Sequence, residues 1–142
     1  MFLGEYKHSL DSKNRLRLPS KFKKDFPSEI ILTKGSDGCL FVLPKETFDT
    51  VFAKASSMPM FDSNVQKSLR MLFSSGAVIE EDNQGRFLLP QSLKSYAEID
   101  KEVVFVGVGS RVELWSSEKW KSYQNSSSDF DSIVKDLSKY GI

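Results

Sequence analysis

The sequence predicts an α+β protein, mostly β, built from two tandem copies of one unit. A nine-residue motif occurs twice, and Asp11, Arg15 and Pro19 hold the same relative places as an aspartate, an arginine and a proline in residues 82–90. The copies are 71 residues apart (82 − 11 = 71), half of the 142-residue chain, which indicates an internal duplication. Around the first motif, apolar and polar side chains alternate with the two-residue period of a β-strand.

Each motif is expected to end a strand and to begin a short helix. Leu16 and Leu18 alternate with two arginines, so one face of this strand is apolar. Pro19 and Pro90 favour extended geometry in the residue before them and are preferred at the first position of a helix. Short helices of about two turns are therefore expected over residues 20–26 and 91–97.

Two further strands and a closing helix complete each unit. Short apolar runs separated by glycine-containing turns predict the strands. They cover residues 30–33 and 40–43 in the first unit and 103–106 and 112–115 in the second. Apolar side chains at helical spacing predict the closing helices. These side chains are Phe48, Val51, Phe52 and Ala55 in the first unit and Trp120 and Tyr123 in the second.

One helix is expected to connect the units, and another to follow the second unit. Asp62 or Ser63 can cap the connecting helix, which ends at Ser74 to Gly76. Residues 126–128 are all serine and predict a flexible joint to a tail helix that is too short to be stable alone. The apolar faces comprise Val65, Leu69, Leu72 and Phe73 in the connecting helix and Ile133, Val134 and Leu137 in the tail.

The two units are expected to share one core, because a single unit has too little apolar surface for independent stability. Interleaving about a pseudo-twofold axis would meet this need and would place Arg15 and Arg86 at equivalent positions on opposite sides of the axis. The predicted organisation is a first repeat over residues 1–60, a connecting helix over 61–76, a second repeat over 72–123, and a joint with a short C-terminal helix over 124–142.

Composition indicates an ordinary globular protein and gives no support for an enzyme. Hydrophobic residues make up 39% and charged residues 27% of the chain, with no long apolar run and no secretory signal pattern, so a cytoplasmic location is expected. Cys39 stands alone in an apolar run and is expected to be buried. With His8 as the only histidine, neither a metal site nor a Cys–His pair can be assembled, and no cofactor is expected. Catalysis by carboxylates alone is the remaining enzymatic alternative and ranks last.

Positive charge is concentrated in the first copy. Residues 1–24 hold seven basic and two acidic side chains, a balance of +5, although the whole chain has a net charge of only +1. Residues 80–94 hold two basic and three acidic side chains, a balance of −1. Attraction to phosphates should therefore act mainly through the first copy.

The repeated aspartate and arginine suit recognition of nucleic acid. An aspartate four residues before an arginine can accept hydrogen bonds from the N–H groups of the turn and can hold the guanidinium in one orientation. The planar guanidinium matches guanine O6 and N7. The predicted contacts are Arg15 and Arg86 at bases or phosphates, Lys13 and Asn14 at the loop tip, and Arg17, Lys21 and Lys24 at phosphates, with Asp11, Asp82 and Gly85 organising the turns.

Structural alternatives stand beside each of these assignments. Both motifs can be salt-bridged turns that only hold the fold, since exposed ion pairs are common and contribute little. Arg86 has acidic neighbours at Glu80 to Asp82 and can instead pair across a subunit boundary. Lys23 and Lys24 are better explained as a solvated helix face than as a contact surface. The aromatic residues Phe48, Phe52, Trp115 and Trp120 favour shared core or subunit contact over a base-stacking platform.

The motifs resemble those of the MraZ family of bacterial transcriptional regulators. The resemblance rests on Gly4-x-Tyr6-x-x-x-Leu10-Asp11-x-Lys13-x-Arg15-Leu-x-Leu-Pro19 and Asp82-x-x-Gly85-Arg86-x-Leu-Leu-Pro90, and it covers residues 1–123. One departure is Asn14, where a glycine is common. Asparagine tolerates left-handed backbone geometry, so the turn should survive, and its side chain could bond a base edge.

The resemblance implies a fold, a function and an assembly. It implies two AbrB-like swapped-hairpin halves fused into one pseudo-twofold β-barrel with flanking short helices, assembled as a ring-shaped homo-oligomer. It also implies nucleoid-associated binding to short direct repeats of double-stranded DNA in the promoter of the protein's own operon, in the division and cell-wall gene cluster. Neither a membrane nor a small-molecule substrate is implied. The alternative function is an oligomeric scaffold or protein-interaction module that does not read bases.

Overall fold

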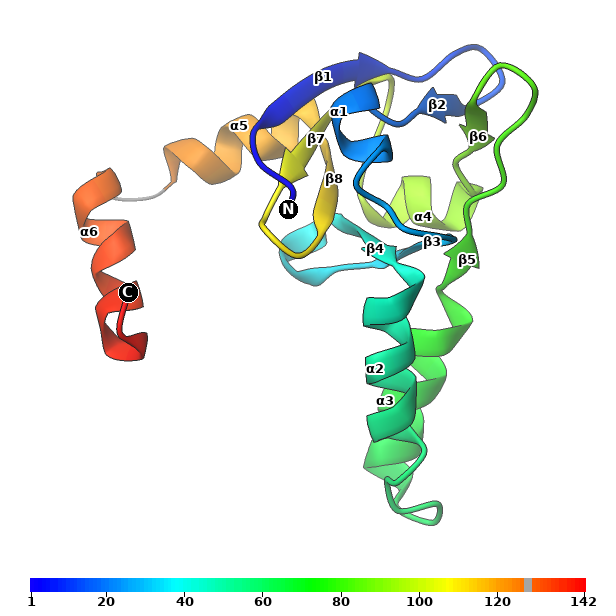
Figure 1. The fold of residues 1–142 in the computed structure, drawn as a ribbon, viewed down its shortest axis with the longest axis vertical. Coiled ribbons are helices and arrows are strands. Elements are labelled where there is room, and N and C mark those ends of the chain that lie inside the picture. The colour runs from blue at the N-terminus through cyan, green and yellow to red at the C-terminus, as the bar shows by residue number, and fades with distance from the viewer. Residues whose placement is uncertain (127–128) are drawn as a thin grey trace.

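The protein is a mixed α/β structure with a mainly antiparallel sheet. The computed structural model describes residues 1–126 and 129–142, in which the strands form one six-stranded and one two-stranded sheet (Figure 1). The strands are β1 (Glu5–Ser9), β2 (Arg15–Arg17), β3 (Ile30–Lys34), β4 (Leu40–Pro44), β5 (Ala77–Val78), β6 (Arg86–Leu88), β7 (Glu102–Gly107) and β8 (Val112–Ser116). The α-helices are α1 (Ser20–Lys23), α2 (Lys45–Ala55), α3 (Ser63–Ser74), α4 (Gln91–Tyr96), α5 (Ser117–Asn125) and α6 (Phe130–Val134), with 3-10 turns at Ser36–Gly38 and Lys135–Tyr140.

The predicted strands and helices are present, with small differences in length. Asp62 caps α3, because its carboxylate accepts hydrogen bonds from the N–H groups of Asn64 and Val65. Helix α1 ends at Lys23 rather than near Phe26. Pro27 disfavours helical geometry in the residue before it, which accounts for the early end. The predicted joint at residues 126–128 lies outside the described residues, apart from Ser126.

The two halves exchange their first strands. The order of the large sheet is β1-β7-β8-β4-β3-β5, and all of its neighbouring strands are antiparallel (Figure 1). Strand β1 of the first half thus pairs with β7 of the second, while β5, which opens the second half, pairs with β3 of the first. The sheet is open, with β1 and β5 as its edges, so the closed barrel expected from the family resemblance is not confirmed.

The strand registers obey a pseudo-twofold relation. Leu16 and Phe87 hold the same place in the two motifs and lie directly opposite each other where β2 pairs with β6. On one side of this pair Arg15 lies opposite Leu88, and on the other Arg17 lies opposite Arg86. Exchanging the halves converts one of these flanking pairs into the other, so an approximate twofold axis passes through the pair of Leu16 and Phe87. Arg15 and Arg86 are therefore equivalent positions about this axis.

One apolar core serves both halves. Leu16 and Phe87 are each only 1% exposed and belong to the same cluster of buried side chains. The cluster also contains Leu18, Phe22, Leu32, Leu40 and Val42 from the first half and Leu89, Leu93, Val103, Phe105, Val112 and Leu114 from the second. The prediction of a shared core agrees with this packing. Cys39 is also buried, and its burial raises the pKa of the thiol to about 12.

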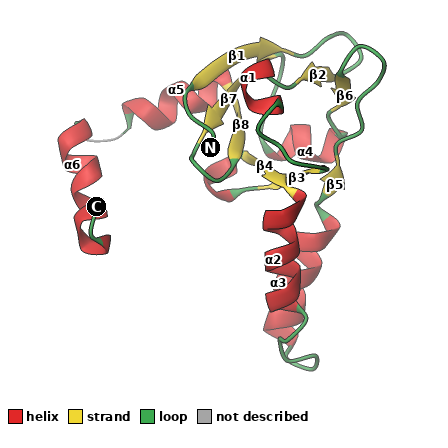
Figure 2. Cartoon of the chain, viewed as in Figure 1, coloured by secondary structure: helices red, strands yellow, loops and turns green. Residues whose placement is uncertain are grey.

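Two segments project from this body. Helices α2 and α3 form a hairpin that extends away from the sheets, and α6 lies apart from the body beyond α5 (Figure 2). No residue of α2 or α3, all of which the structure describes, is buried, so these helices pack mainly on each other. Within residues 1–126 and 129–142, no helix is long and apolar enough to cross a membrane.

Candidate nucleic-acid interface

The first motif forms a turn that is organised by Asp11. One carboxylate oxygen, Oδ1, accepts hydrogen bonds from the backbone N–H groups of Lys13 at 2.9 Å and Arg15 at 2.8 Å. The other oxygen, Oδ2, accepts a hydrogen bond from Nε of Arg15 at 2.7 Å. A single carboxylate therefore closes the turn and orients the guanidinium of the same loop.

The second motif repeats this arrangement. Asp82 Oδ1 accepts hydrogen bonds from the N–H groups of Gln84 and Arg86, both at 2.9 Å, and Oδ2 accepts one from Nε of Arg86 at 2.9 Å. The two turns lie side by side, because β2 and β6 pair directly. Arg15 Nη1 lies 3.9 Å from Asp82 Oδ2, so the first arginine also approaches the carboxylate of the other half.

Both aspartates are held in the ionised form. The hydrogen bond from the backbone N–H of Arg15 is the main cause that lowers the pKa of Asp11 below its ordinary value. The N–H of Arg86 does the same for the pKa of Asp82. Hydrogen bonds to a carboxylate favour its charged form. Each turn therefore keeps a negative charge that holds its arginine at neutral pH.

Left-handed backbone geometry is required at one position of each turn. Asn14 has φ 59° and Gly85 has φ 76°, and both stand directly before the arginine of their motif. Asparagine and glycine are the residues that enter this region at least cost. The prediction that the turn survives with Asn14 in place of glycine agrees with this geometry.

We expect Gly85→Ala to lower the free energy of unfolding by about 1 to 2 kcal/mol, the cost of left-handed geometry for a residue with a Cβ. A Cβ at this position would lie 3.5 Å from Glu81 Oε2 and 3.8 Å from Lys23 Nζ, so there is room for it and the cost is that of the backbone. Gly85→Asn, which copies the first half, should lose less stability. Urea denaturation of the three proteins measures this difference, and equal losses for both variants would contradict the explanation.

The arginines remain able to bind a ligand after they have been oriented. Their side chains are 27% exposed for Arg15 and 25% for Arg86. Among the described residues, the Nη groups of both arginines make no hydrogen bond, since only Nε of each donates to its aspartate. The terminal nitrogens can therefore still donate hydrogen bonds to a guanine edge or a phosphate, although Nη1 of Arg15 also lies near Asp82.

A shallow pocket joins the two motifs. It is lined by His8, Ser9, Asp11, Arg15, Leu16, Arg17 and Arg86. Arg15, Arg17 and Arg86 were each predicted to contact nucleic acid, and all three line this one pocket. His8, which was expected to form neither a metal site nor a Cys–His pair, also lines this pocket. The pairing of β1 with β7 places this imidazole edge-on to Phe105, with ring centroids 5.4 Å apart, and burial lowers its pKa.

The remaining predicted contacts lie on different surfaces. Lys13 is exposed at the loop tip, as expected, whereas the side-chain oxygen of Asn14 accepts a hydrogen bond from Lys94 Nζ at 3.0 Å. This bond ties Asn14 to α4, a contact between residues 80 positions apart that no local pattern predicts. Lys21 and Lys24 line a separate pocket beside β1. Lys23, predicted as part of a solvated helix face, forms an ion pair with Glu81 at 2.7 Å.

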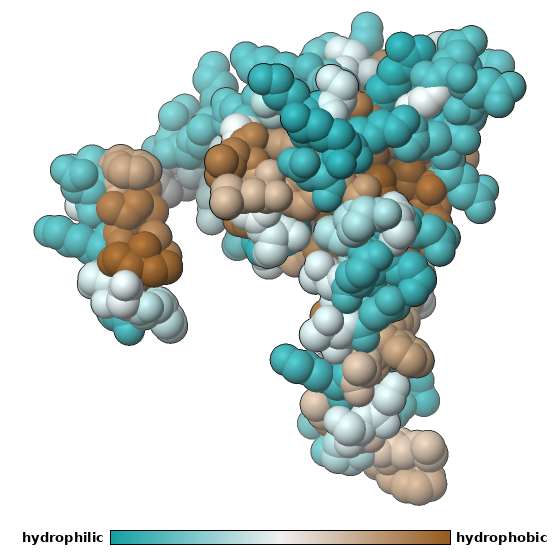
Figure 3. Space-filling model, in the orientation of Figure 1, coloured by the Kyte–Doolittle hydropathy of each residue, from teal (hydrophilic) through white to brown (hydrophobic). Residues whose placement is uncertain are grey.

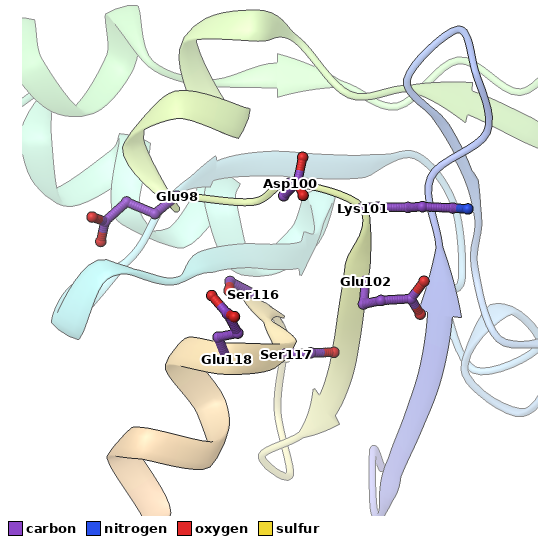
Figure 4. A pocket seen from close by; sticks show the side chains of 7 residues that line it. All are labelled: Glu98, Asp100, Lys101, Glu102, Ser116, Ser117 and Glu118. Atoms are coloured by element: carbon purple, nitrogen blue, oxygen red, sulfur yellow. The ribbon is translucent and has the colours of Figure 1, made fainter.

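A second pocket has the opposite charge. It lies in the second half, between the loop before β7 and the start of α5, and four of its lining residues are acidic (Figure 4). The lining residues are Glu98, Asp100, Lys101, Glu102, Ser116, Ser117 and Glu118. A surface of this charge repels phosphates, so it is not part of a nucleic-acid interface. Among the described residues, no three His, Cys, Asp or Glu side chains are grouped so as to hold a metal ion.

Comparisons with known proteins agree with the duplicated motif. The family model described as "MraZ protein, putative antitoxin-like" matches twice, over residues 1–71 and 72–138. The protein named "Transcriptional regulator MraZ" from Clostridium acetobutylicum is 44% identical over 142 residues, and that from Clostridium beijerinckii is 43% identical over 142 residues, each alignment covering 100% of both chains. The protein of the same name from Carboxydothermus hydrogenoformans is 44% identical over 88% of this chain and 87% of its own. The chain therefore belongs to the MraZ family of transcriptional regulators.

Proposed function

We propose that this protein is a sequence-specific DNA-binding regulator that recognises short tandem repeats in its own promoter, within the division and cell-wall gene cluster. It acts in the cytoplasm, associated with the nucleoid, and as a ring-shaped homo-oligomer. One observation carries the proposal. Two equivalent Asp–Arg turns lie side by side, and each orients a guanidinium through Nε while its Nη groups form no hydrogen bond among the described residues.

The residues at and near the turns contact different parts of the DNA. Arg15 and Arg86 contact base edges or phosphates, and Lys13 reaches the DNA from the loop tip. Arg17 lies opposite Arg86 in the strand pairing and adds positive charge for phosphate contact. Asn14 contacts the DNA once its hydrogen bond to Lys94 is broken. Lys21 and Lys24 contact phosphates farther along the duplex, because they lie on the neighbouring surface of α1.

The first half is the principal reading element. Residues 1–24 carry the excess of positive charge, whereas Glu80, Glu81 and Asp82 surround Arg86. A single turn binds weakly, but a ring places many turns close together. Tandem repeats are then bound by several copies at once, and effective concentration supplies the affinity that one turn lacks.

The fold that supports this function consists of two AbrB-like repeats, over residues 1–60 and 72–123, joined by the helix within 61–76. The strand exchange between the halves and their single core support this division. We also propose that the two halves approach the swapped-hairpin barrel of that fold, with β2 and β6 at the reading end.

A scaffold function is the second candidate, because two contacts at the motifs join the halves of the chain. Arg15 approaches Asp82 at 3.9 Å, and Lys23 pairs with Glu81 at 2.7 Å. If the motifs serve only assembly, Arg15→Ala should change the mass of the oligomer, and neither the wild-type protein nor the variant should bind DNA with sequence preference. DNA binding and oligomer mass, measured on the same sample, separate the two functions.

Equilibrium binding to the DNA upstream of the protein's own gene tests the proposal. A scrambled duplex of equal length and composition is the control. We expect tighter binding to the natural sequence at every salt concentration, and a loss of affinity for both duplexes as salt rises, since phosphate contacts release counterions. Equal affinity for the two duplexes would rule out sequence-specific reading.

A further inference from the structure

The tail carries an apolar face that is largely exposed. Phe130, Ile133 and Leu137 are 76%, 47% and 42% exposed, and together with Val134 they follow the i, i+3, i+4, i+7 spacing of one helix face. Figure 3 shows this face as a continuous hydrophobic stripe. Among the described residues, no hydrogen bond or ion pair joins residues 129–142 to the rest of the chain. A helix this short needs a partner surface to be stable.

The pseudo-twofold relation shows which kind of partner the tail lacks. Strand β4 leads into α2, and its equivalent β8 leads into α5. In the first half, α2 is followed by α3, and the two pack together with Phe48 and Phe73 edge to face at 5.3 Å. In the second half, α5 is followed by the tail, which lies apart from it (Figure 1). The tail therefore follows α5 in the chain as α3 follows α2, but it lies apart from that helix and its apolar face is exposed.

The α2–α3 hairpin offers an apolar groove that is also uncovered. The groove is lined by Phe52, Ala55, Ser56, Leu69 and Phe73. Phe52 is 58% exposed, although sequence reasoning placed it in a shared core or a subunit contact, so the structure excludes the core for this residue. Apolar residues are also exposed on the hairpin in Figure 3.

The charges of the two surfaces are complementary. Helix α3 carries Lys67 and Arg70 and no acidic residue between Ser63 and Ser74. Neither of these basic side chains forms an ion pair with an acidic side chain of the described residues. The tail carries three aspartates against two lysines; Asp129 caps α6 and Asp131 lies in its first turn. The acidic start of the tail therefore suits the basic helix α3, which contributes Leu69 and Phe73 to the groove.

We propose that the tail of one chain, residues 129–140, docks in the α2–α3 groove of a neighbouring copy. The neighbour is the occupant because α5 carries the tail away from the hairpin of its own chain (Figure 1). Tail and groove are different surfaces, so the contact is head-to-tail, and such contacts close into a ring when the rotation between subunits permits. This inference rests on the proposed ring and names the surfaces that build it.

Matched aspartate substitutions on the two faces of the tail test the contact. Ile133→Asp is expected to raise the protein concentration needed for assembly at least tenfold, because it puts a charge on the apolar face. Ser132→Asp adds the same charge next to it on the polar face and should leave assembly unchanged. Light scattering over a concentration series measures the mass. Assembly that is unchanged by Ile133→Asp, or equally weakened by Ser132→Asp, would overturn the proposal.

Disulfide trapping shows whether the contact is made between chains. Cys39 is buried, so introduced surface thiols are the ones that react. A Leu69→Cys protein is mixed with a size-tagged Ile133→Cys protein under mild oxidation, and a disulfide between the two chains is expected. Lys7→Cys replaces Leu69→Cys as the control, because Lys7 is exposed on β1. Failure to form the hairpin–tail disulfide, or equal trapping with the control, would overturn the proposal.

Measurements of DNA binding distinguish failure of the tail contact from failure of the proposed function. The Ile133→Asp protein should retain binding to a single repeat and lose the gain in affinity from tandem repeats. If the wild-type protein forms a ring and the Ile133→Asp protein forms the same ring, only the tail contact is refuted, and the proposed DNA reading still stands. A wild-type protein that is monomeric at all concentrations refutes the ring, and the tail contact with it.

Discussion

Replacing Arg15 with alanine is expected to weaken binding to the DNA upstream of the protein's own gene by roughly 10- to 100-fold, the range expected for loss of one bidentate base contact. The reason is geometric, because Asp11 holds Nε and the two Nη groups form no hydrogen bond among the described residues. Arg15→Lys should lose nearly as much discrimination, since lysine provides charge without the planar fork. Fluorescence anisotropy with natural and scrambled duplexes measures both effects.

Two further variants provide comparisons for the affinity of Arg15→Ala. Arg86→Ala should weaken binding less, because the acidic residues around Arg86 already reduce its attraction to phosphates. Lys54→Ala removes an exposed charge from the last turn of α2, far along the chain from both motifs, and should change affinity little. Affinity of Arg15→Ala equal to that of the Lys54→Ala control would remove Arg15 from the reading surface.

Phe87→Ala is expected to lower the free energy of unfolding by about 3 to 5 kcal/mol, which is typical of truncating a buried phenylalanine. Phe87 is 1% exposed and lies opposite Leu16 on the pseudo-twofold axis. Both halves contribute to the core around it, so the variant should still unfold in one cooperative transition. Chemical denaturation followed by far-UV circular dichroism and by tryptophan fluorescence measures both quantities.

The neighbouring residue supplies the control. Leu88 is 62% exposed on the same strand, so Leu88→Ala should change stability by no more than about 0.5 kcal/mol. Two separate transitions in Phe87→Ala, with fluorescence and circular dichroism no longer coincident, would show that the halves fold independently and would contradict the shared core.

Much of the fold follows from local sequence rules. The strands, the helices and the caps depend on periodicity and on single residues such as Pro19 and Asp62, so their positions could be predicted within a few residues. The two Asp–Arg turns were likewise predictable, because the hydrogen bonds of Asp11 and Asp82 reach only two and four residues along the chain. The duplication identified the pseudo-twofold relation itself.

What could not be predicted depends on contacts between distant residues. Local patterns do not show that β1 pairs with β7 of the other half, or that the sheet stays open at β1 and β5. His8 joins the pocket of Arg15 only through this strand pairing. The bond between Asn14 and Lys94 depends in the same way on the packing of α4 beside the first turn.

The central claim is that paired Asp–Arg turns read a repeated DNA sequence. The most direct measurement is a footprint of the wild-type protein on the DNA upstream of its own gene. We expect protected boxes of similar sequence spaced by about 10 base pairs, one helical turn, so that neighbouring subunits meet the same face of the duplex. Uniform weak protection without repeated boxes would contradict sequence reading, and a footprint of Arg15→Ala identical to that of the wild type would contradict the assignment of the turns.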